Sequence, residues 1–424
     1  MSSATETWPA PQASGIAGKV SVPGSKSLTN RELLLSALAA RPSTLVDPLD
    51  SRDTRLMIEA LTKLGIGFSR TGNELTVTPG SLAGPAIIDC GLAGTVMRFV
   101  PPMAALASGR IEFDGDESAR RRPMQTTIES LRQLGVVVDA KVNGLPFAID
   151  GTGSIAGGEL TIDASASSQF VSGLLLSAPR FEQGLVLHHS GEHLPSMPHI
   201  EMTLQCLRER GVKAEQTGVA SWSVAPGEIQ GARIQIEPDL SNAGPFLAAA
   251  LVGGGQVEIP NWPESTTQVG AMYVELLIQM GGSLTLSGGS LIASGDGTIH
   301  GINADLSAAG ELTPTIAALA ALADSPSRLT GIGHLRGHET DRLKALVAEI
   351  NNLGGNAIEL EDGIEIEPTT LHGGLWHTYE DHRMATAGAI IGLRVSGVEV
   401  EDISVTSKTM PEFESMWRDL VGKS

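Results

Sequence analysis

The sequence predicts an α/β (α+β) protein of two similar domains, each built from three βαβαββ-type repeat units. Two observations indicate this fold: two kinds of helix alternate along the chain, and short alternating apolar and polar segments lie between them. With 424 residues, the chain is long enough for two or three domains. Six repeat units are too many for one hydrophobic core, so three units per domain is the economical division.

The first helix of each predicted unit follows a turn and a capping residue and is rich in small apolar residues. Such self-similarity along a chain is the signature of a repeat architecture. If these helices face inward, their N-termini bring free N–H groups to a common space and make it electropositive. The six predicted helices span residues 25–40, 93–108, 167–178, 241–252, 309–323 and 381–393.

The second helix of each unit is more clearly amphipathic, and five of the six end directly before a glycine, the usual helix stop. These helices are predicted at 54–64, 124–134, 199–210, 269–280, 340–353 and 412–421. Alternating segments typical of strands occur at 74–78, 111–113, 185–189, 257–259 and 363–366. A new capped helix begins after Pro238. We therefore expect one discontinuous domain, 1–23 plus 239–424, with 24–238 inserted.

Composition narrows the class of protein. The formal net charge of −19 argues against general binding to nucleic acid or to an anionic membrane. The two cysteines, Cys90 and Cys206, supply neither a disulfide framework nor metal-ligand spacing, which fits a reducing cytoplasm. Residues 1–14 lack the pattern of a signal peptide, and no apolar stretch reaches the length of about 18 residues that suggests a membrane span. We expect a cytoplasmic protein.

Charged residues gather at the starts of predicted helices. Ser25 or Ser27 can cap the first helix, beside Lys26 and Arg31, which makes either an anion cradle or an ordinary capped helix with solvated cations. Residues 119–123 place three arginines before a helix, where they form either an anion site or a solvated turn.

Three later stretches, 335–342, 379–384 and 407–411, also carry charge at helix starts. In the first, Thr340 could cap a helix, and Glu339 and Arg342 are spaced to pair, as an active group or as a surface ion pair. In the second, charges open a very apolar helix, where they are costly unless paired or functional. The histidines near residue 190 have no metal-ligand spacing, and we interpret them as strand and loop residues.

Seven motifs then occur in one order: PGSKSLTNR (23–31), LAGTVMR (92–98), RRRP (120–123), SASSQF (165–170), HETDR (338–342), DHRM (381–384) and TSKTMPEF (406–413). On these motifs the chain resembles the 5-enolpyruvylshikimate-3-phosphate (EPSP) synthase family, from residue 22 to residue 413. The resemblance implies an inside-out α/β barrel in each domain and an active site in the interdomain cleft. It also implies transfer of the carboxyvinyl group of phosphoenolpyruvate to the 5-hydroxyl of shikimate 3-phosphate, with release of phosphate, on the route to aromatic amino acids.

The resemblance carries roles onto matching residues. It implies no metal and no cofactor, small-molecule substrates only, and we expect a monomer. Glu311 resembles the base for the attacking hydroxyl, and Glu339 resembles the acid for the vinyl carbon, with Lys26 assisting. The residues implied to bind phosphoenolpyruvate are Lys26, Gly94, Arg122, Gln169, Arg342, Arg383 and Lys408. The residues implied to bind shikimate 3-phosphate are Lys26, Ser27, Arg31, Ser167, Ser168, Gln169, Ser196, Glu311, His334 and His338.

The chain departs from the family pattern at Leu92, Glu311, His338 and His199, where many members have Asn, Asp, Lys and Tyr. The resemblance also suggests that Gly94 leaves room for glyphosate beside phosphoenolpyruvate. Two alternatives remain open. One is the related UDP-N-acetylglucosamine enolpyruvyl transferase, which typically uses a loop cysteine that is missing before Arg122 here. The other is a non-catalytic scaffold or phosphosugar-binding protein, which would not explain the paired Glu311 and Glu339.

Overall fold

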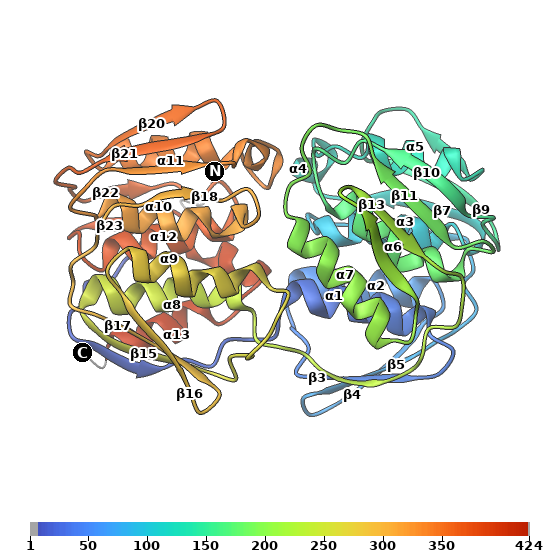
Figure 1. Cartoon of the computed structure of the whole chain (residues 1–424), viewed down its shortest axis with the longest axis horizontal. Coiled ribbons are helices and arrows are strands. Elements are labelled where there is room, and N and C mark those ends of the chain that lie inside the picture. Colours follow the sequence, from blue (N-terminus) through green and yellow to red (C-terminus); the bar gives the residue numbers. More distant parts are fainter. Residues whose placement is uncertain (1–6, 423–424) are drawn as a thin grey trace, which may run out of the picture. The chain divides into compact units, whose positions relative to one another are not determined.

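A computed structural model describes residues 7–422 of the chain, so part of the N-terminal stretch analysed for a signal peptide lies outside the described residues. The structure divides into two compact units (Figure 1). The terminal unit contains the residues up to Pro23 and those from Glu237 onward, and the inserted unit is Gly24–Ile236. The sequence placed the second break after residue 238.

The middle repeat of the inserted unit shows the basic pattern of the fold. Strand β6 pairs in parallel with β7, and the antiparallel pairs β7–β9 and β9–β8 complete a four-stranded sheet in the order β6-β7-β9-β8. One helix crosses between the two parallel strands, and a second precedes the hairpin. The order is therefore βαβαββ, as the sequence predicts: β6 (Ala86–Asp89), α3 (Gly94–Ala104), β7 (Ser108–Asp114), α5 (Gln125–Gln133), β8 (Val137–Ala140) and β9 (Phe147–Thr152).

Two further repeats follow this pattern without a break in the chain, one in each unit. In the inserted unit it comprises β10 (Gly158–Ile162), α6 (Gln169–Ser177), β11 (Leu185–His189), α7 (Met197–Glu209), β12 (Ala214–Gly218) and β13 (Ser221–Val224). In the terminal unit it comprises β18 (Asn303–Asp305), α10 (Thr313–Ala321), β19 (Ser327–Thr330), α11 (Arg342–Asn352), β20 (Asn356–Leu360) and β21 (Gly363–Glu367).

Two more repeats take their first strand from a distant part of the chain. Strand β2 (Ile16–Lys19) precedes α1 in the sequence but pairs in parallel with β15 of the terminal unit. Strand β14 (Arg233–Gln235) precedes α8 but pairs in parallel with β3 of the inserted unit. The other elements of these two repeats are α1 (Lys26–Leu38), β3 (Ser43–Val46), α2 (Arg52–Lys63), β4 (Gly67–Thr71) and β5 (Glu74–Thr78), and α8 (Leu240–Gly253), β15 (Gly255–Pro260), α9 (Tyr273–Gln279), β16 (Ser283–Ser287) and β17 (Ser290–Gly295).

The sixth repeat is shorter than the sequence predicts. Its sheet has the order β1-β23-β22, and β1 (Trp8–Pro9), from near the N-terminus, pairs antiparallel with β23 where the other repeats use a hairpin strand. The remaining elements are β22 (Gly374–Trp376), α12 (His382–Gly392), β23 (Val398–Val400) and α13 (Phe413–Val421). Six short helices connect other elements within residues 7–422: α4 (Glu117–Arg120), which was not predicted from the sequence, η1 (Ala178–Arg180), η2 (Val269–Met272), η3 (Gly310–Leu312), η4 (Gly333–Gly337) and η5 (Ile403–Lys408).

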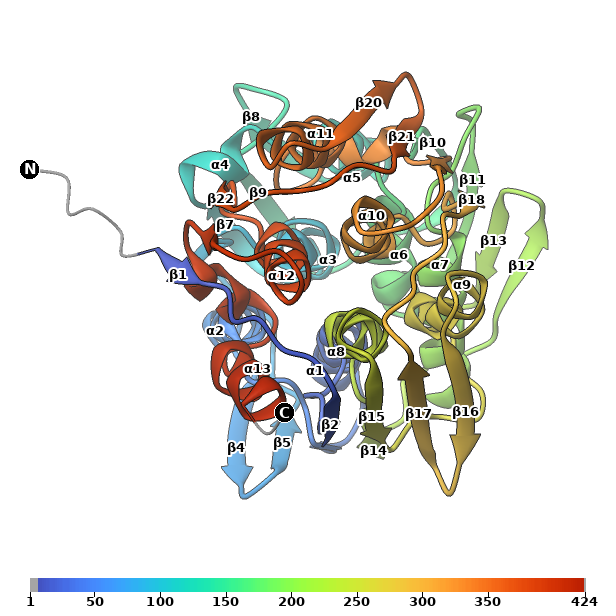
Figure 2. The same cartoon turned by 90° about the vertical axis from the view of Figure 1, so that its left-hand side faces the viewer.

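All twelve predicted helices are present, and the first helix of each repeat lies inside its unit. Viewed nearly end-on, α8, α10 and α12 lie in the middle of the terminal unit, with the sheets outside them (Figure 2). Every residue of α10 is buried. In the inserted unit, α3 and α6 approach so closely that a Cβ on Gly173 would lie 2.2 Å from the carbonyl oxygen of Arg98. Small residues therefore permit the helix contacts of this core.

Within residues 7–422, the structure contains no helix long and apolar enough to cross a membrane.

The inserted unit should fold alone, because its three sheets, including the one completed by β14, lie within residues 24–236. A fragment of residues 24–236 should unfold cooperatively in urea, with Trp222, its single tryptophan and fully buried, as the fluorescent probe. A fragment of residues 24–231, which lacks β14, should have a lower unfolding midpoint because one edge of β3 loses its partner. A longer fragment without a cooperative transition would contradict the autonomy of the unit.

Candidate active site

The start of α1 carries the first predicted site residue. Ser25, not Ser27, caps this helix by accepting a hydrogen bond from the Leu28 N–H at 3.4 Å. Lys26 is the first residue of the helix, and its Nζ lies 3.5 Å from Oδ2 of the buried Asp53 on α2. A carboxylate therefore fixes this cation beside the free N–H groups of a helix N-terminus, where an anion would be attracted.

Arg31 is buried, with only 2% of the residue exposed. Its Nε donates to the hydroxyl of Thr203 at 2.8 Å, and its Nη2 donates to the carbonyl of His199 at 2.9 Å. Its Nη1 donates to the carbonyl of Ser27 at 2.9 Å. In this structure Arg31 joins α1 to α7, and its role toward shikimate 3-phosphate stays a prediction.

Three residues implied to bind phosphoenolpyruvate converge at the start of α3. A Cβ added to Gly94 would lie 3.0 Å from Oε1 of Gln169 and 3.1 Å from Nη2 of Arg122. Nη1 of Arg122 donates to the carbonyl of Leu92 at 3.2 Å. Gln169 Oε1 and Arg122 Nε are buried and have no hydrogen-bond partner among the described residues. Buried polar atoms normally have partners, so this group offers polar contacts to a small ligand.

The serines predicted for the acceptor lie at the starts of α6 and α7. The Ser167 hydroxyl accepts a hydrogen bond from the Gln169 N–H at 3.2 Å, and Ser168 is the buried N-cap of α6. Ser196 is the N-cap of α7 and has a φ of +55°, in the left-handed region that is uncommon for residues other than glycine. Five helix starts of the inserted unit, α1, α3, α5, α6 and α7, thus carry the predicted residues or directly follow them.

In the terminal unit, a buried ion pair joins α11 to α12. Asp381, the N-cap of α12, accepts hydrogen bonds from Nε of Arg342 at 2.7 Å and from its Nη2 at 3.1 Å. The same carboxylate accepts the N–H of Arg383 at 2.9 Å. Burial lowers the pKa of Arg342, but the carboxylates of Asp381, Glu339 and Glu311 outweigh this effect and raise the pKa above its ordinary value. Arg342 is therefore a permanent cation.

Glu339 lies between two cations. Its Oε2 accepts from Nη2 of Arg342 at 2.9 Å, and its Oε1 accepts from Nζ of Lys408 at 2.7 Å. The pairing of Glu339 with Arg342 was expected from their spacing. The suggested capping residue Thr340 is not the one used, because Asp341 caps α11 by accepting from the Lys344 N–H. Three charged residues predicted from two separate motifs, Glu339 and Arg342 from one and Lys408 from the other, thus form one cluster.

Glu311, the predicted base, belongs to η3, directly before α10. The Ser241 hydroxyl at the start of α8 donates a short hydrogen bond to Oε1 of Glu311, and Nη2 of Arg383 lies 3.6 Å from the same oxygen. The sequence analysis did not select Ser241 as a site residue. Its place at the start of an inner helix, equivalent to that of other selected residues, was the signal that could have identified it.

His334 and His338 lie side by side, with ring centroids 5.7 Å apart. Nη1 of Arg342 is 3.2 Å from Nδ1 of His338. His334 packs so tightly against the residue before Glu311 that a Cβ on Gly310 would lie 2.6 Å from its Nε2. The structure thus places both histidines in the same part of the terminal unit as Glu311 and Glu339.

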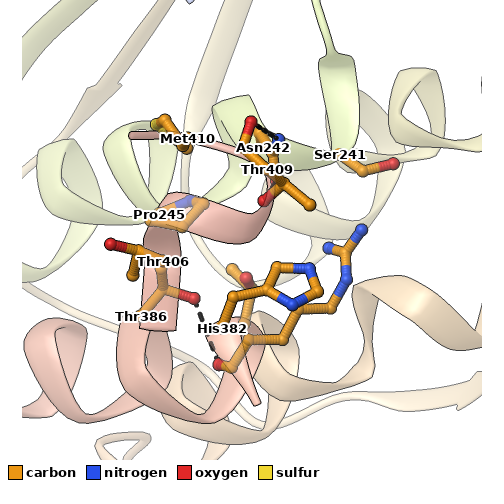
Figure 3. A pocket seen from close by; sticks show the side chains of 10 residues that line it. Ser241, Asn242, Pro245, His382, Thr386, Thr406, Thr409 and Met410 are labelled. Carbon is orange, nitrogen blue, oxygen red and sulfur yellow. Dashed lines mark hydrogen bonds between the residues drawn. The ribbon is translucent and has the colours of Figure 1, made fainter. Parts of the chain in front are cut away.

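A narrow polar pocket lies beside Ser241 and Arg383 (Figure 3). Asn242 and Thr409 are hydrogen-bonded to one another at one side of it, and Thr386 lies at another side. Its volume of about 10 Å³ has room for about one water molecule. Neither predicted substrate fits in this pocket.

No group of three or more His, Cys, Asp or Glu side chains within residues 7–422 could hold a metal ion.

The fold and these clusters define the class: an α/β repeat protein whose inner helix starts carry groups suited to anionic small molecules. Two solved EPSP synthase structures from Acinetobacter baumannii are similar to it, with TM-scores of 0.80 and 0.79, each at 25% identity and covering 98% of both chains. A curated 3-phosphoshikimate 1-carboxyvinyltransferase of Kocuria rhizophila is 56% identical over 431 residues, covering 98% of this chain and 97% of the relative.

The family model for EPSP synthase (3-phosphoshikimate 1-carboxyvinyltransferase) matches residues 11–417, and the chain belongs to this family. The family and the fold class predicted from the sequence are confirmed. The comparisons leave the role of each site residue open, so these roles stay predictions.

His334, which packs against Gly310, should make the stability of the protein depend on pH. Burial, opposed by Asp362 and assisted by Arg342, lowers the pKa of His334 below its ordinary value of 6.5. The unfolded chain then binds the proton more readily than the folded one, so stability present above pH 6.5 is lost as the pH falls from 6.5 toward the lower folded pKa. Urea unfolding at several pH values between 7.5 and 5 should show a steeper loss for the wild type than for His334→Asn. Parallel pH profiles would contradict this.

Proposed function

We propose that this chain transfers the carboxyvinyl group of phosphoenolpyruvate to the 5-hydroxyl of shikimate 3-phosphate and releases phosphate. The observation that carries the proposal is the 56% identity, over nearly the whole chain, to a curated 3-phosphoshikimate 1-carboxyvinyltransferase. The reaction is an addition followed by an elimination, and it belongs to the shikimate pathway that leads to aromatic amino acids. No metal or cofactor takes part in the proposal.

The proposed donor site uses cations from both units. The inserted unit contributes Lys26 and Arg122 with Gly94 and Gln169, and the terminal unit contributes Arg342, Arg383 and Lys408. The two substrates carry two phosphates and two carboxylates, which repel each other, so the reaction needs several fixed cations. Charge-assisted hydrogen bonds of this kind contribute about 1.5–3 kcal/mol each. These residues of the two units are the proposed ligands of phosphoenolpyruvate.

Glu339 is proposed to protonate the methylene carbon of the donor, with Lys26 assisting. In this structure its carboxylate is paired with Arg342 and Lys408, which favours the charged form that cannot act as an acid. Both cations are also proposed ligands of phosphoenolpyruvate. A bound donor would therefore compete for them, reduce their hold on Glu339 and add its own negative charge, which favours uptake of the proton that the reaction needs.

Glu311 is proposed to accept the proton of the 5-hydroxyl as its oxygen attacks the donor. The hydrogen bond from Ser241 and the nearby guanidinium of Arg383 orient the carboxylate. Ser27, Arg31, Ser167, Ser168, Gln169, Ser196, His334 and His338 complete the proposed acceptor site. The family pattern has other residues at Glu311 and His338, but Glu311 keeps the carboxylate that the proton transfer requires.

The alternative of a UDP-N-acetylglucosamine enolpyruvyl transferase is disfavoured by the cysteines. Cys90 is buried, and burial, with the charge of Asp89, raises the pKa of its thiol to about 12. Burial likewise raises the pKa of Cys206 well above its ordinary value. Both thiols stay protonated at neutral pH and are shielded from a substrate. We also propose a cytoplasmic location and a monomer, which fits two free cysteines and the negative net charge.

The direct test is to incubate the purified chain with phosphoenolpyruvate and one of two acceptors, and to measure phosphate release. Shikimate 3-phosphate should support release with an equal amount of enolpyruvyl product, and UDP-N-acetylglucosamine should not. Release with only the second acceptor would favour the related transferase. Binding of either substrate without any release would favour the phosphosugar-binding alternative.

The two glutamates should be essential for turnover and dispensable for acceptor binding. A carboxamide keeps their shape but cannot exchange protons, so Glu311→Gln and Glu339→Gln should lower kcat by roughly 100-fold or more. Calorimetry should show shikimate 3-phosphate still bound. In deuterated water the wild type should place deuterium in the vinyl group, and the slow product of Glu339→Gln should show altered incorporation. Wild-type turnover and labelling in Glu339→Gln would leave Lys26 as the acid.

A further inference from the structure

A strained turn stands directly before the Asp381 that fixes Arg342. The Asp381 N–H donates to the Thr378 carbonyl at 2.8 Å, and the two residues between them, Tyr379 and Glu380, have φ values of +54° and +56°. A positive φ at both central positions defines a type I′ turn, which strongly prefers Asn-Gly or Asp-Gly. Tyr-Glu is a poor sequence for this turn, so contacts elsewhere must hold its conformation.

Glu349 supplies these contacts from α11. Its side chain is only 1% exposed. Oε2 accepts the His377 N–H at 3.0 Å, before the turn, and Oε1 accepts the Tyr379 hydroxyl at 2.5 Å, within it. Burial, together with the Glu349 carboxylate, raises the pKa of Tyr379, so its phenol stays protonated and donates. One buried carboxylate thus accepts hydrogen bonds from a residue before the turn and from a residue within it.

The same helix meets the same segment a second time through Arg342. Glu349 and Arg342 are two helical turns apart and so share a face of α11. Arg342 binds Asp381 at the end of the turn, and Asp381 also accepts the Arg383 N–H. The turn therefore sets where the Asp381 carboxylate lies, and this carboxylate sets where the two guanidinium-bearing residues lie.

Glu401, which belongs to the segment after β23, contacts the first residue of the turn, Thr378. Its Oε2 accepts the Thr378 N–H at 3.0 Å and lies 3.5 Å from the Thr378 hydroxyl. Glu349 on α11 thus contacts the turn itself, in addition to the Arg342–Asp381 pair at its end. His377 adds a weaker contact, with its Nδ1 3.2 Å from Oε2 of Glu349.

We infer that Glu349 is a positioning residue for the donor site: it holds the Tyr379–Glu380 turn in its left-handed conformation and thereby places Arg342 and Arg383. This inference rests on the proposed function, in which these two arginines bind phosphoenolpyruvate. It assigns Glu349 no contact with either substrate. Its loss should therefore affect the donor and spare the acceptor ligands of the inserted unit.

The test compares the full-length wild type with Glu349→Ala and with the milder Tyr379→Phe. Glu349→Ala should raise KM for phosphoenolpyruvate about tenfold, the effect expected when a hydrogen-bonded charge is lost. KM for shikimate 3-phosphate should change less than about twofold. Tyr379→Phe removes one hydroxyl and should show a smaller rise in the same direction. Glu258→Ala is the matched control, because Glu258 also belongs to the terminal unit and accepts two side-chain hydrogen bonds, from Lys19 and Ser290.

A rescue variant separates positioning from general loss of structure. Adding Tyr379→Asn and Glu380→Gly to Glu349→Ala supplies the residues that a type I′ turn prefers, so the turn should form without Glu349. This variant should regain most of the wild-type KM for phosphoenolpyruvate. Because Tyr379→Phe removes only one hydroxyl, it provides the same comparison if Glu349→Ala does not fold.

Amide hydrogen exchange supplies a readout independent of turnover. The Arg383 N–H should exchange faster in Glu349→Ala and Tyr379→Phe and return toward wild type in the rescue variant. Unchanged exchange would overturn the positioning role. Two results would show that Glu349 does not act on the donor site: faster exchange with an unchanged KM for phosphoenolpyruvate, or equal rises of KM for both substrates. A wild type that releases no phosphate would instead refute the proposed function, while exchange would still decide the positioning.

Discussion

Burial of the inner helices on all sides is the constraint on which the rest of the structure depends. A helix surrounded by other helices and sheets can carry almost no charge along its length, because an unpaired charge there would lose its hydration. Every residue of α10 is buried, and the side chains along α8 and α12 are nearly all buried too. Charged and polar groups are therefore found mainly at the starts of these helices, where free backbone N–H groups attract anions. The fold thereby concentrates its chemistry at the same end of each repeat.

At one such start, the Arg342–Asp381 pair shows how a buried charge is made tolerable. The guanidinium donates two hydrogen bonds to Asp381 and one to Glu339, and its Nη1 lies 3.2 Å from Nδ1 of His338, so most of its polar groups have partners although the residue is buried. Breaking a buried pair by removing one partner typically costs about 3–5 kcal/mol. A group held this firmly stays in place without a ligand. Preorganised cations lose little conformational entropy when a substrate binds, which is an advantage for a site that must bring anions together.

The sequence was sufficient for the helices and for the family, because caps, glycine stops and seven ordered motifs are local signals. The pairing of the strands could not be predicted from the sequence, because alternation of apolar and polar residues shows that a strand is half-buried but not which strand lies beside it. The contact between Arg342 and Asp381, which are far apart in sequence, was hidden for the same reason, although both stand in selected motifs. Glu349 gave no signal at all: it lies within a helix, and the turn that it holds lacks the residues that identify such turns. Ser241 was missed because a lone serine at a helix start is usually only a cap.

The exchanged strands β2 and β14 bear on how the chain is made. On the ribosome β2 emerges before the inserted unit, yet its partner β15 appears only after the whole inserted unit has been synthesised, since Gly18 pairs with Val257. The inserted unit is complete as soon as β14 emerges, so it can fold during synthesis while β2 waits. Both exchanged strands lie at sheet edges, β2 beside β15 and β14 beside β3. Each sheet can therefore assemble its other strands first and accept the late partner last, without opening its middle.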